Sequence, residues 1–338
     1  FMVIVILPYI ALQLKAISAS VDILMGSGPQ VSKMLPRISF DGTSFMVTLA
    51  LAVFAILFGT RHADATEHQQ GLMLAIAAGS VVKLIAFVAV GLFVVYSIFS
   101  GIDHLVHRSA NNYPVVEIFG NGLDGGSWLT GTLLSFVAIL LLPRQFHVAV
   151  VENRSEREVR WAGWMFPVYL VLINLFVVPI AVAGIMTVPT SGTPNDFYVI
   201  GLPIAGGSQG MSILAFIGGL SAATAMVIVE SIALAIMICN GVVVPFLLRQ
   251  NVLEFMPKQN VTQRLLMIRR IAIVFILLSS YVVYRAIGTQ QDLAIIGLNS
   301  LAGVAQLAPV FFIGLMWRDA TARGAIAGLF AGFFMWGY

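Results

Sequence analysis

Long apolar runs separated by short polar segments make up this chain from end to end. A membrane-spanning helix needs about 20 predominantly apolar residues to cross ~30 Å of hydrocarbon. By that measure the pattern predicts nine spanning helices. They are residues 1–24, 44–60, 70–99, 128–142, 163–186, 211–248, 271–287, 293–317 and 324–338.

Composition narrows the class of protein further. Of the 338 residues, 59% are hydrophobic and only 10% are charged, whereas an ordinary soluble domain is about 25% charged. So little charge cannot cover a water-soluble surface, and solidly apolar runs exclude the alternating pattern of a membrane barrel. The single cysteine allows no internal disulfide, and the net charge of +3 gives no indication of a nucleic-acid partner. We therefore predict an all-α polytopic protein surrounded by a lipid bilayer.

The loops between the predicted spans differ sharply in charge. Every second loop is basic, and these loops together hold twelve Lys and Arg residues against three in the others. The positive-inside rule then places the start of span 1–24 in the cytoplasm and the end of span 324–338 outside. Because the sequence opens and closes within apolar runs, we expect an internal segment of a longer protein, with no signal peptide.

Two predicted spans have unusual lengths. Span 128–142 is short, while span 211–248 has 38 residues, which is roughly 57 Å if it is fully helical. We expect a break in the longer span at Gly218 and Gly219. Short or interrupted helices are typical of transporter binding sites, where free backbone groups face a cavity. The alternative for 128–142 is a short helix followed by an amphipathic surface helix at 143–161.

Three ionisable side chains fall inside spans, where a charge costs at least ~2.5 kcal/mol. Glu230 lies in the middle of span 211–248, too deep for so short a side chain to reach either interface. Burial disfavours a charged carboxylate, which makes Glu230 a candidate proton carrier; the alternative is a neutral or salt-bridged structural residue. Lys83 lies in the middle of span 70–99, where Glu230 is a possible partner. Lys15 is expected to be structural.

Several motif-like patterns carry no chemistry. Gly120, Gly122 and Gly125 form a G-x-G-x-x-G with no preceding strand, so a dinucleotide site is not predicted. His104 and His107 are too few ligands for a metal site. No phosphate-binding, kinase or hydrolase motif is present either. We predict no catalytic residue, no metal and no cofactor, and this segment is not expected to be an enzyme.

Three stretches resemble one family of transporters. Residues 314–328 resemble the G-L-x-W-x-x-x-T-x-x-G-A-x-x-G signature of the sodium:solute symporter family through Gly314, Trp317, Thr321, Gly324 and Gly328. Residues 9–17 (YIALQLKAI) resemble the third core helix of that family, and residues 66–73 (TEHQQGLM) are similar to the entry into its fifth. The resemblance runs in order along essentially the whole chain.

The resemblance implies a LeuT-like fold of two inverted five-helix repeats. The nine spans would be core helices 3 to 11, with the first two missing from this segment. Span 128–142 would be the sixth core helix and span 293–317 the tenth, which carry substrate contacts in the family. Asn299 and Ser300 lie between Gly297 and Gly303, where a bend would direct side chains into a cavity. The implied substrate-binding residues are Gln13, Thr132, Ser135, Phe136, Gly297, Asn299 and Ser300.

The chain departs from the family at the second sodium site. Relative to Asn240, which matches the family's aspartate, the two hydroxyl ligands fall on Leu234 and Ala235. Neither side chain has an oxygen, whereas hard cations need several oxygen ligands. Ser231 and Glu230 lie one turn earlier, and in proton-coupled relatives of this fold a lysine on the fifth core helix replaces the ion. We therefore favour a proton over sodium, with Glu230, Lys83 and Ser231 as the coupling residues.

Residues 142–147 (LPRQFH) and 61–66 (RHADAT) resemble one branch in particular, the transporter-like domains of CbrA-type bacterial sensor histidine kinases. The implied function is ion-coupled symport of a small polar solute in the bacterial inner membrane, with an amino acid such as histidine or proline as the solute. The alternative is a sensory input domain that binds the solute without net transport. A cytoplasmic histidine kinase, fused or separate, is then an expected partner, and the full-length parent would be a protein kinase.

Overall fold

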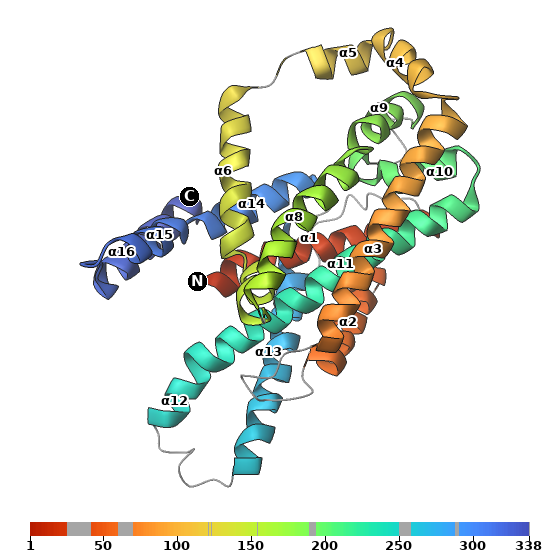
Figure 1. Ribbon diagram of the computed structural model, residues 1–338. Coiled ribbons are helices and arrows are strands. Elements are labelled where there is room, and N and C mark those ends of the chain that lie inside the picture. Colours follow the sequence, from red (N-terminus) through yellow and green to blue (C-terminus); the bar gives the residue numbers. More distant parts are fainter. Residues whose placement is uncertain are drawn as a thin grey trace.

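The computed structural model describes residues 1–25, 42–59, 70–120, 122, 124–153, 155–188, 194–249, 258–287 and 291–337. Within these ranges every regular element is a helix (Figure 1). Three short elements, η1, η2 and η4, are π-helical, and η3 is a 3₁₀ helix. The elements are α1 (Met2–Leu24), α2 (Thr43–Gly59), α3 (Gln70–Leu92), η1 (Phe93–Ile98), α4 (Ile102–Ala110), α5 (Tyr113–Gly120), α6 (Gly125–Leu141), α7 (Pro143–Phe146), η2 (His147–Val151), α8 (Glu156–Asn174), α9 (Val177–Thr187), η3 (Asn195–Phe197), α10 (Tyr198–Ala205), α11 (Gln209–Ile238), η4 (Cys239–Val243), α12 (Val244–Arg249), α13 (Lys258–Ile287), α14 (Leu293–Ala305), α15 (Ala308–Met316) and α16 (Ala322–Gly337).

Six helical segments of the described chain are long and apolar enough to cross a membrane. The count rises to seven if α5 and α6, which meet at an angle of 77°, form one broken span. The protein is therefore an all-α polytopic membrane protein. Predicted spans 44–60 and 324–338 correspond to α2 and α16, which are helical but only 17 and 16 residues long. The six long segments are Met2–Leu24, Met73–Ile98, Glu156–Thr187, Gln209–Arg249, Val261–Ile287 and Leu293–Met316.

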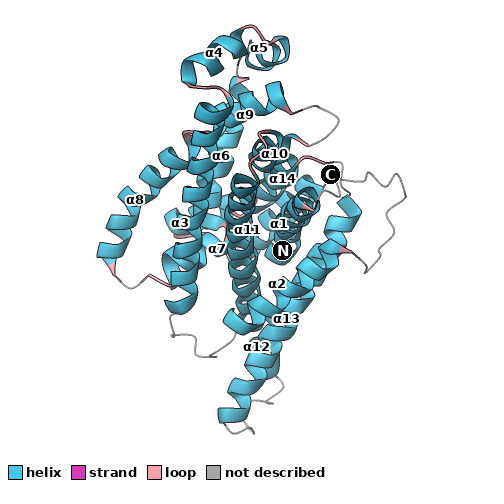
Figure 2. Ribbon diagram, turned by 90° about the vertical axis from the view of Figure 1, so that its right-hand side faces the viewer, coloured by secondary structure: helices cyan, strands magenta, loops and turns pink. Residues whose placement is uncertain are grey.

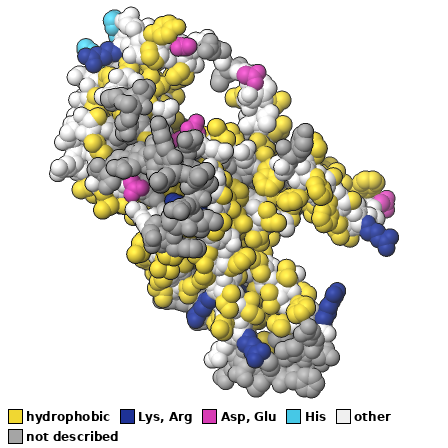
Figure 3. Space-filling view, turned by 180° about the vertical axis from the view of Figure 1, so that it is seen from behind, with side chains coloured by type: hydrophobic (Ala, Val, Ile, Leu, Met, Phe, Trp, Pro, Cys, Tyr) yellow, Lys and Arg dark blue, Asp and Glu magenta, His cyan; other side chains and the backbone are white. Residues whose placement is uncertain are grey.

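The long helices run side by side between two distinct ends (Figure 2). At one end α4 and α5 form a cap, and at the other end α12 and the start of α13 extend beyond the rest. Several Lys and Arg side chains are visible at the α12–α13 end in Figure 3. The charge pattern of the sequence predicts that this end faces the cytoplasm. Helix α16 projects from the side of the bundle (Figures 1 and 3).

Helix α11 is the central helix and packs against α1, α2, α3, α10 and α13. A large apolar cluster surrounds its second half, where Val227, Ile232 and Leu234 meet Ile276 and Leu277 of α13. A smaller cluster joins α9 and α10 to η1. Cys239, the only cysteine of the chain, begins η4 and is fully buried.

The expected break at Gly218 and Gly219 was wrong, because α11 continues unbroken from Gln209 to Ile238. Gly218 instead allows close helix packing. A Cβ added to it would lie 2.4 Å from the Cβ of Ala86 on α3, so only glycine permits this approach. One turn away, the Ser221 hydroxyl donates a hydrogen bond to the carbonyl oxygen of Gly79, also on α3, at 3.2 Å. Small residues and hydroxyls are the usual means of joining helices in lipid.

Other irregular segments follow the prediction only in part. Span 128–142 is short, as predicted, and corresponds to the unbroken helix α6, which meets α5 at an angle of 77°. Span 293–317 does break, but at Gln306 and Leu307, just before Pro309 rather than beside Asn299. Proline cannot donate the backbone hydrogen bond that would continue the helix and clashes with the preceding turn. The single surface helix expected at 143–161 is instead α7, η2 and the start of α8 at Glu156.

Asp124 caps the N-terminus of α6. Its Oδ2 accepts hydrogen bonds from the Ser127 backbone N–H at 2.9 Å and from the Ser127 hydroxyl at 2.7 Å. These bonds favour the carboxylate and hold the pKa of Asp124 below its ordinary value of about 3.8. The cap therefore stabilises α6 fully above that ordinary value, and its contribution is lost as the pH falls through the lower pKa of the folded state.

We expect Asp124→Ala to fray the first turn of α6, whereas Asp124→Asn retains a capping side chain at every pH. The measurement is hydrogen exchange at the Ser127 and Trp128 amides, normalised to unstructured peptides at each pH. Wild-type protection should fall toward that of the alanine variant below pH 3.8. Equal protection in the wild type and the alanine variant at pH 6 would show that Asp124 does not cap α6.

Candidate functional site

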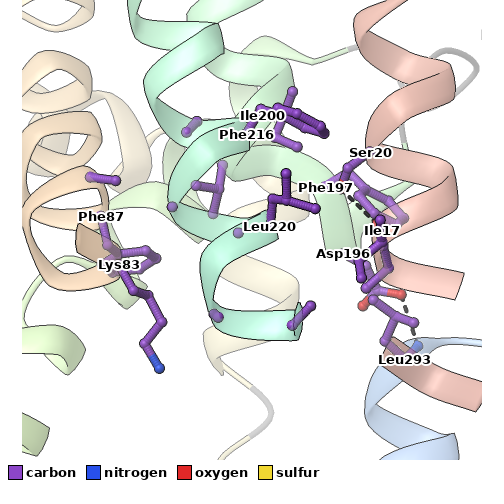
Figure 4. A pocket seen from close by; sticks show the side chains of 18 of the residues that line it. Ile17, Ser20, Lys83, Phe87, Asp196, Phe197, Ile200, Phe216, Leu220 and Leu293 are labelled. Atoms are coloured by element: carbon purple, nitrogen blue, oxygen red, sulfur yellow. Dashed lines mark hydrogen bonds between the residues drawn. The ribbon is translucent and has the colours of Figure 1, made fainter. Parts of the chain in front are cut away.

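A cavity of about 440 Å³ lies inside the bundle. Its walls come from α1, α3, the α8–α9 break, η3, α10, α11 and the first residue of α14 (Figure 4). Pockets of roughly 300–1,000 Å³ with an apolar lining and a few polar groups are typical of small-molecule sites. The apolar lining includes Ile17, Phe87, Phe197, Ile200, Phe216, Leu220 and Leu293, and the polar side chains are Ser20, Lys83, Asn174 and Asp196.

Asp196, in η3, is held at one side of the cavity. Its Oδ2 accepts a hydrogen bond from the Leu293 backbone N–H at 2.8 Å, which ties η3 to the start of α14 (Figure 4). Lys15 of α1 donates to the carbonyl oxygen of Gln291 and is attracted by the carboxylates of Asp196 and Asp292. Three segments that are distant in the sequence therefore meet at this side of the cavity, with the buried Lys15 compensated by two carboxylates.

Lys83 lies on the other side of the cavity, on α3 (Figure 4). Its Nζ is 5.7 Å from the centroid of the Tyr169 ring of α8, within the range of a cation–π contact. The Cα of Lys83 lies 3.8 Å from the place that a Cβ added to Gly218 would take, so Lys83 is level with Gly218 of α11. Glu230 is twelve residues further along α11, or roughly 18 Å at the helical rise. The two charges therefore do not pair with each other, although their helices are in contact.

Glu230 is the one charge-bearing residue of α11, and none of its surface is exposed. Neither carboxylate oxygen has a hydrogen-bond partner among the described residues. A buried polar group without a partner is rare in native structures and calls for a functional or structural explanation. Glu230 lies about two turns along α11 from Ala223, which lines the cavity.

Arg144 is the residue near this carboxylate that sequence reasoning missed. Its guanidinium charge and backbone N–H both act on Glu230, although neither is placed to form a hydrogen bond. The same guanidinium lies 5.8 Å from the centroid of the Tyr9 ring of α1. By charge alone Arg144 belongs to a cytoplasmic loop. Pro143 could have indicated that a helix, not a loop, contains Arg144, because proline favours the first position of a helix. In the structure α7 starts at Pro143 and contacts α11.

Another ionisable residue, His147, lies directly after α7. His147 of η2 is buried, and its Nε2 lies 3.5 Å from an oxygen of Glu152. Burial lowers the pKa of His147 below its ordinary value, and the Glu152 carboxylate opposes that effect only in part. His147 is therefore neutral at pH 7.

The predicted residues on α6 do not line the cavity. Thr132, Ser135 and Phe136 are exposed on the outer side of α6. The Thr132 and Ser135 hydroxyls donate to backbone carbonyls of their own helix, at 2.9 and 2.8 Å. Phe136 stacks on Phe312 of α15 with ring centroids 6.5 Å apart. Helices α6 and α14 pack against each other.

The predicted residues on α14 lie beside α1 and α16 instead of the cavity. Ser300 is buried and donates to the Ile296 carbonyl at 3.0 Å, while the carbonyl of Asn299 accepts from Trp336 Nε1 at 2.8 Å. A Cβ on Gly297 would lie 3.4 Å from Leu12 of α1. On α1 itself, the neighbouring Gln13 is buried.

The two positions that the resemblance aligns with sodium ligands are apolar in this chain. Leu234 and Ala235 are buried in the large apolar cluster around α11. Ser231 is also fully buried, and its hydroxyl donates to the carbonyl of Ile228 at 3.0 Å. Its single oxygen is thus engaged within its own helix.

Comparisons with known proteins found no relative. No family model, no curated protein and no solved structure matches this chain. The function therefore has to be argued from the residues and their arrangement.

Proposed function

We propose that this chain is the membrane domain of an ion-coupled transporter that carries a small polar solute, such as the amino acids histidine or proline, across the bacterial inner membrane. One observation carries the proposal. Helix α11 forms a wall of a solute-sized cavity and, about two turns further along, bears a fully buried carboxylate that has no hydrogen-bond partner in the described part of the chain. Ionisable groups within membrane helices are expensive and typically mark ion or proton pathways.

The charges at the cavity fit a zwitterionic solute. Lys83 supplies a cation on one side and Asp196 a carboxylate on another, while the remaining lining is mostly apolar. A proton is the favoured coupling ion, because Glu230 can bind one without further ligands. A sodium ion would need several oxygens, which Leu234 and Ala235 cannot supply.

The test of this proposal is uptake into proteoliposomes that contain the whole chain. Radiolabelled histidine and proline are offered with a proton gradient alone, a sodium gradient alone, or neither. Accumulation driven by the proton gradient supports the proposal, and accumulation driven only by sodium overturns the assignment of the ion. Saturable binding without accumulation under any gradient would favour the alternative, a sensory domain that serves a cytoplasmic histidine kinase. Absence of both binding and uptake contradicts the proposal as a whole.

Filling the cavity gives a second prediction. Ala222 of α11 lines it, so Ala222→Phe should occupy space that the solute needs. We expect solute affinity to fall at least about tenfold, which corresponds to ~1.4 kcal/mol. Equilibrium binding of the labelled solute in detergent measures this directly. The matched control is Ile217→Phe on the same helix, whose side chain is 47% exposed. Equal affinities for the two variants would place the solute elsewhere.

A further inference from the structure

The region around Glu230 contains one feature that the proposed function does not use, the position of Arg144. The Tyr9 hydroxyl contacts the sulfur of Met226 at 4.0 Å. Met226 and Glu230 are four residues apart on α11 and so share one helix face. Arg144, over the Tyr9 ring, therefore lies on the side of α11 that bears the carboxylate. Rotation about the bonds of the long arginine side chain is the movement that would bring the guanidinium to it.

We propose that Arg144 is a mobile counter-charge for Glu230. Its guanidinium rests on the Tyr9 ring when Glu230 carries a proton and moves onto the carboxylate when the proton leaves. The described structure corresponds to the first state, because Arg144 is over the ring and the carboxylate has no partner. The inference deepens the proposed function by naming what responds to the coupling proton.

The relative strengths of the two contacts support such an exchange. A cation–π contact at a half-buried site is weak, whereas an ionised carboxylate inside the bundle is strongly destabilised unless it is paired. Loss of the proton from Glu230 therefore favours the ion pair between Arg144 and Glu230, and return of the proton favours the contact between Arg144 and the Tyr9 ring. Arg144 is suited to both contacts, because a guanidinium stacks on aromatic faces and also binds carboxylates through two parallel hydrogen bonds.

Other charges near α11 do not take this role. Helices α2 and α10 have no charged residue. Lys15 of α1 is engaged with Gln291, Asp196 and Asp292, and His147 of η2 is neutral at pH 7 because burial lowers its pKa. Among the described residues Arg144 is the one whose charge acts on Glu230. The ionisable groups on the described elements packed against α11 or next to α7 are Tyr9, Lys15, Asp22, Lys83, Arg144, His147, Tyr198, Cys239, Arg264, Arg269, Arg270, Tyr281, Tyr284 and Arg285.

Movement of Arg144 would also change the electrostatic field at the cavity. Its charge acts on Lys83 as well as on Glu230, and Lys83 lines the cavity. Shifting the guanidinium toward Glu230 changes the electrostatic field at Lys83. The protonation of a buried group is thereby linked to the side chain that a solute carboxylate would meet.

The test uses a hydrophobic carbodiimide, which modifies protonated carboxyl groups in apolar surroundings. The rate of Glu230 modification at pH 7 is followed by mass spectrometry in the whole reconstituted chain, with Glu230→Gln as the blank. Arg144→Gln should raise the rate at least about threefold, because the cation that favours the ionised form is gone. Tyr9→Leu should lower the rate, because Arg144 loses its resting place on the ring and stays on the carboxylate.

Matched variants separate the proposed exchange from general disturbance. Arg144→Lys keeps the charge and Tyr9→Phe keeps the ring, so both should stay nearer the wild-type rate than Arg144→Gln and Tyr9→Leu. Arg157→Gln, on the exposed first turn of α8, should leave the rate unchanged. An unchanged rate in Arg144→Gln, or in Tyr9→Leu, overturns the proposal. Because labelling needs no transport, a chain that fails to take up solute still tests Arg144, and the two proposals fail separately.

Discussion

Replacement of Glu230 by glutamine is expected to abolish proton-driven accumulation. Glutamine has nearly the same shape but cannot bind and release a proton, so the solute can no longer be coupled to the gradient. With one proton per solute, a gradient of two pH units drives about 100-fold accumulation, since each unit contributes tenfold. In the variant the ratio should fall to about 1, which is simple equilibration. Uptake into proteoliposomes under an imposed pH gradient measures the ratio.

The same variant should still fold and still exchange solute. Glu230 makes no hydrogen bond with the described residues that glutamine would lose, so the melting temperature should change little. Solute counterflow, which needs no proton gradient, should persist. The control is Glu117→Gln on the exposed α5, which should accumulate solute as the wild type does. If Glu230→Gln accumulates solute normally, this carboxylate is not the coupling group.

Gly218→Val should be among the most destabilising substitutions in this chain. The contact between α3 and α11 places the Cβ of Ala86 2.4 Å from where a Cβ on residue 218 would lie. Both atoms are fixed to helix backbones, so neither moves aside unless the helices separate. Overpacking of this kind costs typically 1–3 kcal/mol and sometimes more. For a chain of this size we expect the melting temperature to fall by roughly 2–4 °C.

The adjacent glycine supplies the control for that substitution. A Cβ on Gly219 would meet nothing within 4 Å, so Gly219→Ala should leave the melting temperature close to that of the wild type. Differential scanning fluorimetry in detergent, with each variant purified in parallel, gives the comparison. Similar melting temperatures for Gly218→Val and Gly219→Ala would mean that α3 and α11 do not approach as closely as the structure describes.

The sequence was most informative where local chemistry decides the structure. Lengths of apolar runs located the helices, because every backbone group inside lipid must be satisfied within its own helix. At one span a proline marks the break better than a glycine does, although Pro8, Pro167 and Pro203 lie inside continuous helices. Span 293–317 breaks just before Pro309, whereas the paired glycines at 218 and 219 sit in a continuous helix. In lipid a glycine often serves contact between helices, and a single sequence does not distinguish that use from a hinge.

The candidate site was less predictable, because it depends on which helix faces meet. Burial of Glu230 could be inferred from its depth in an apolar run, but its separation from Lys83 could not, since that depends on how α3 and α11 align. For Thr132 and Ser135, too, the sequence does not show which way the side chains face. Helix α6 is apolar all around, so no hydrophobic pattern indicates which side faces lipid. Arg144 was assigned to a loop because the positive-inside rule describes the average position of charges and says nothing of a short helix that contacts the core.

Because Cys239 is buried, the native chain should react little with thiol reagents and can serve as the unlabelled reference in cysteine-accessibility experiments. The only thiol lies at the start of η4 with none of its surface exposed, and thiol reagents act on accessible thiolates. Cysteines introduced one at a time along the cavity wall would then be the reactive sites without removal of the natural one. Their rates with membrane-permeant and impermeant maleimides, with and without solute, would report from which side of the bilayer water reaches each position.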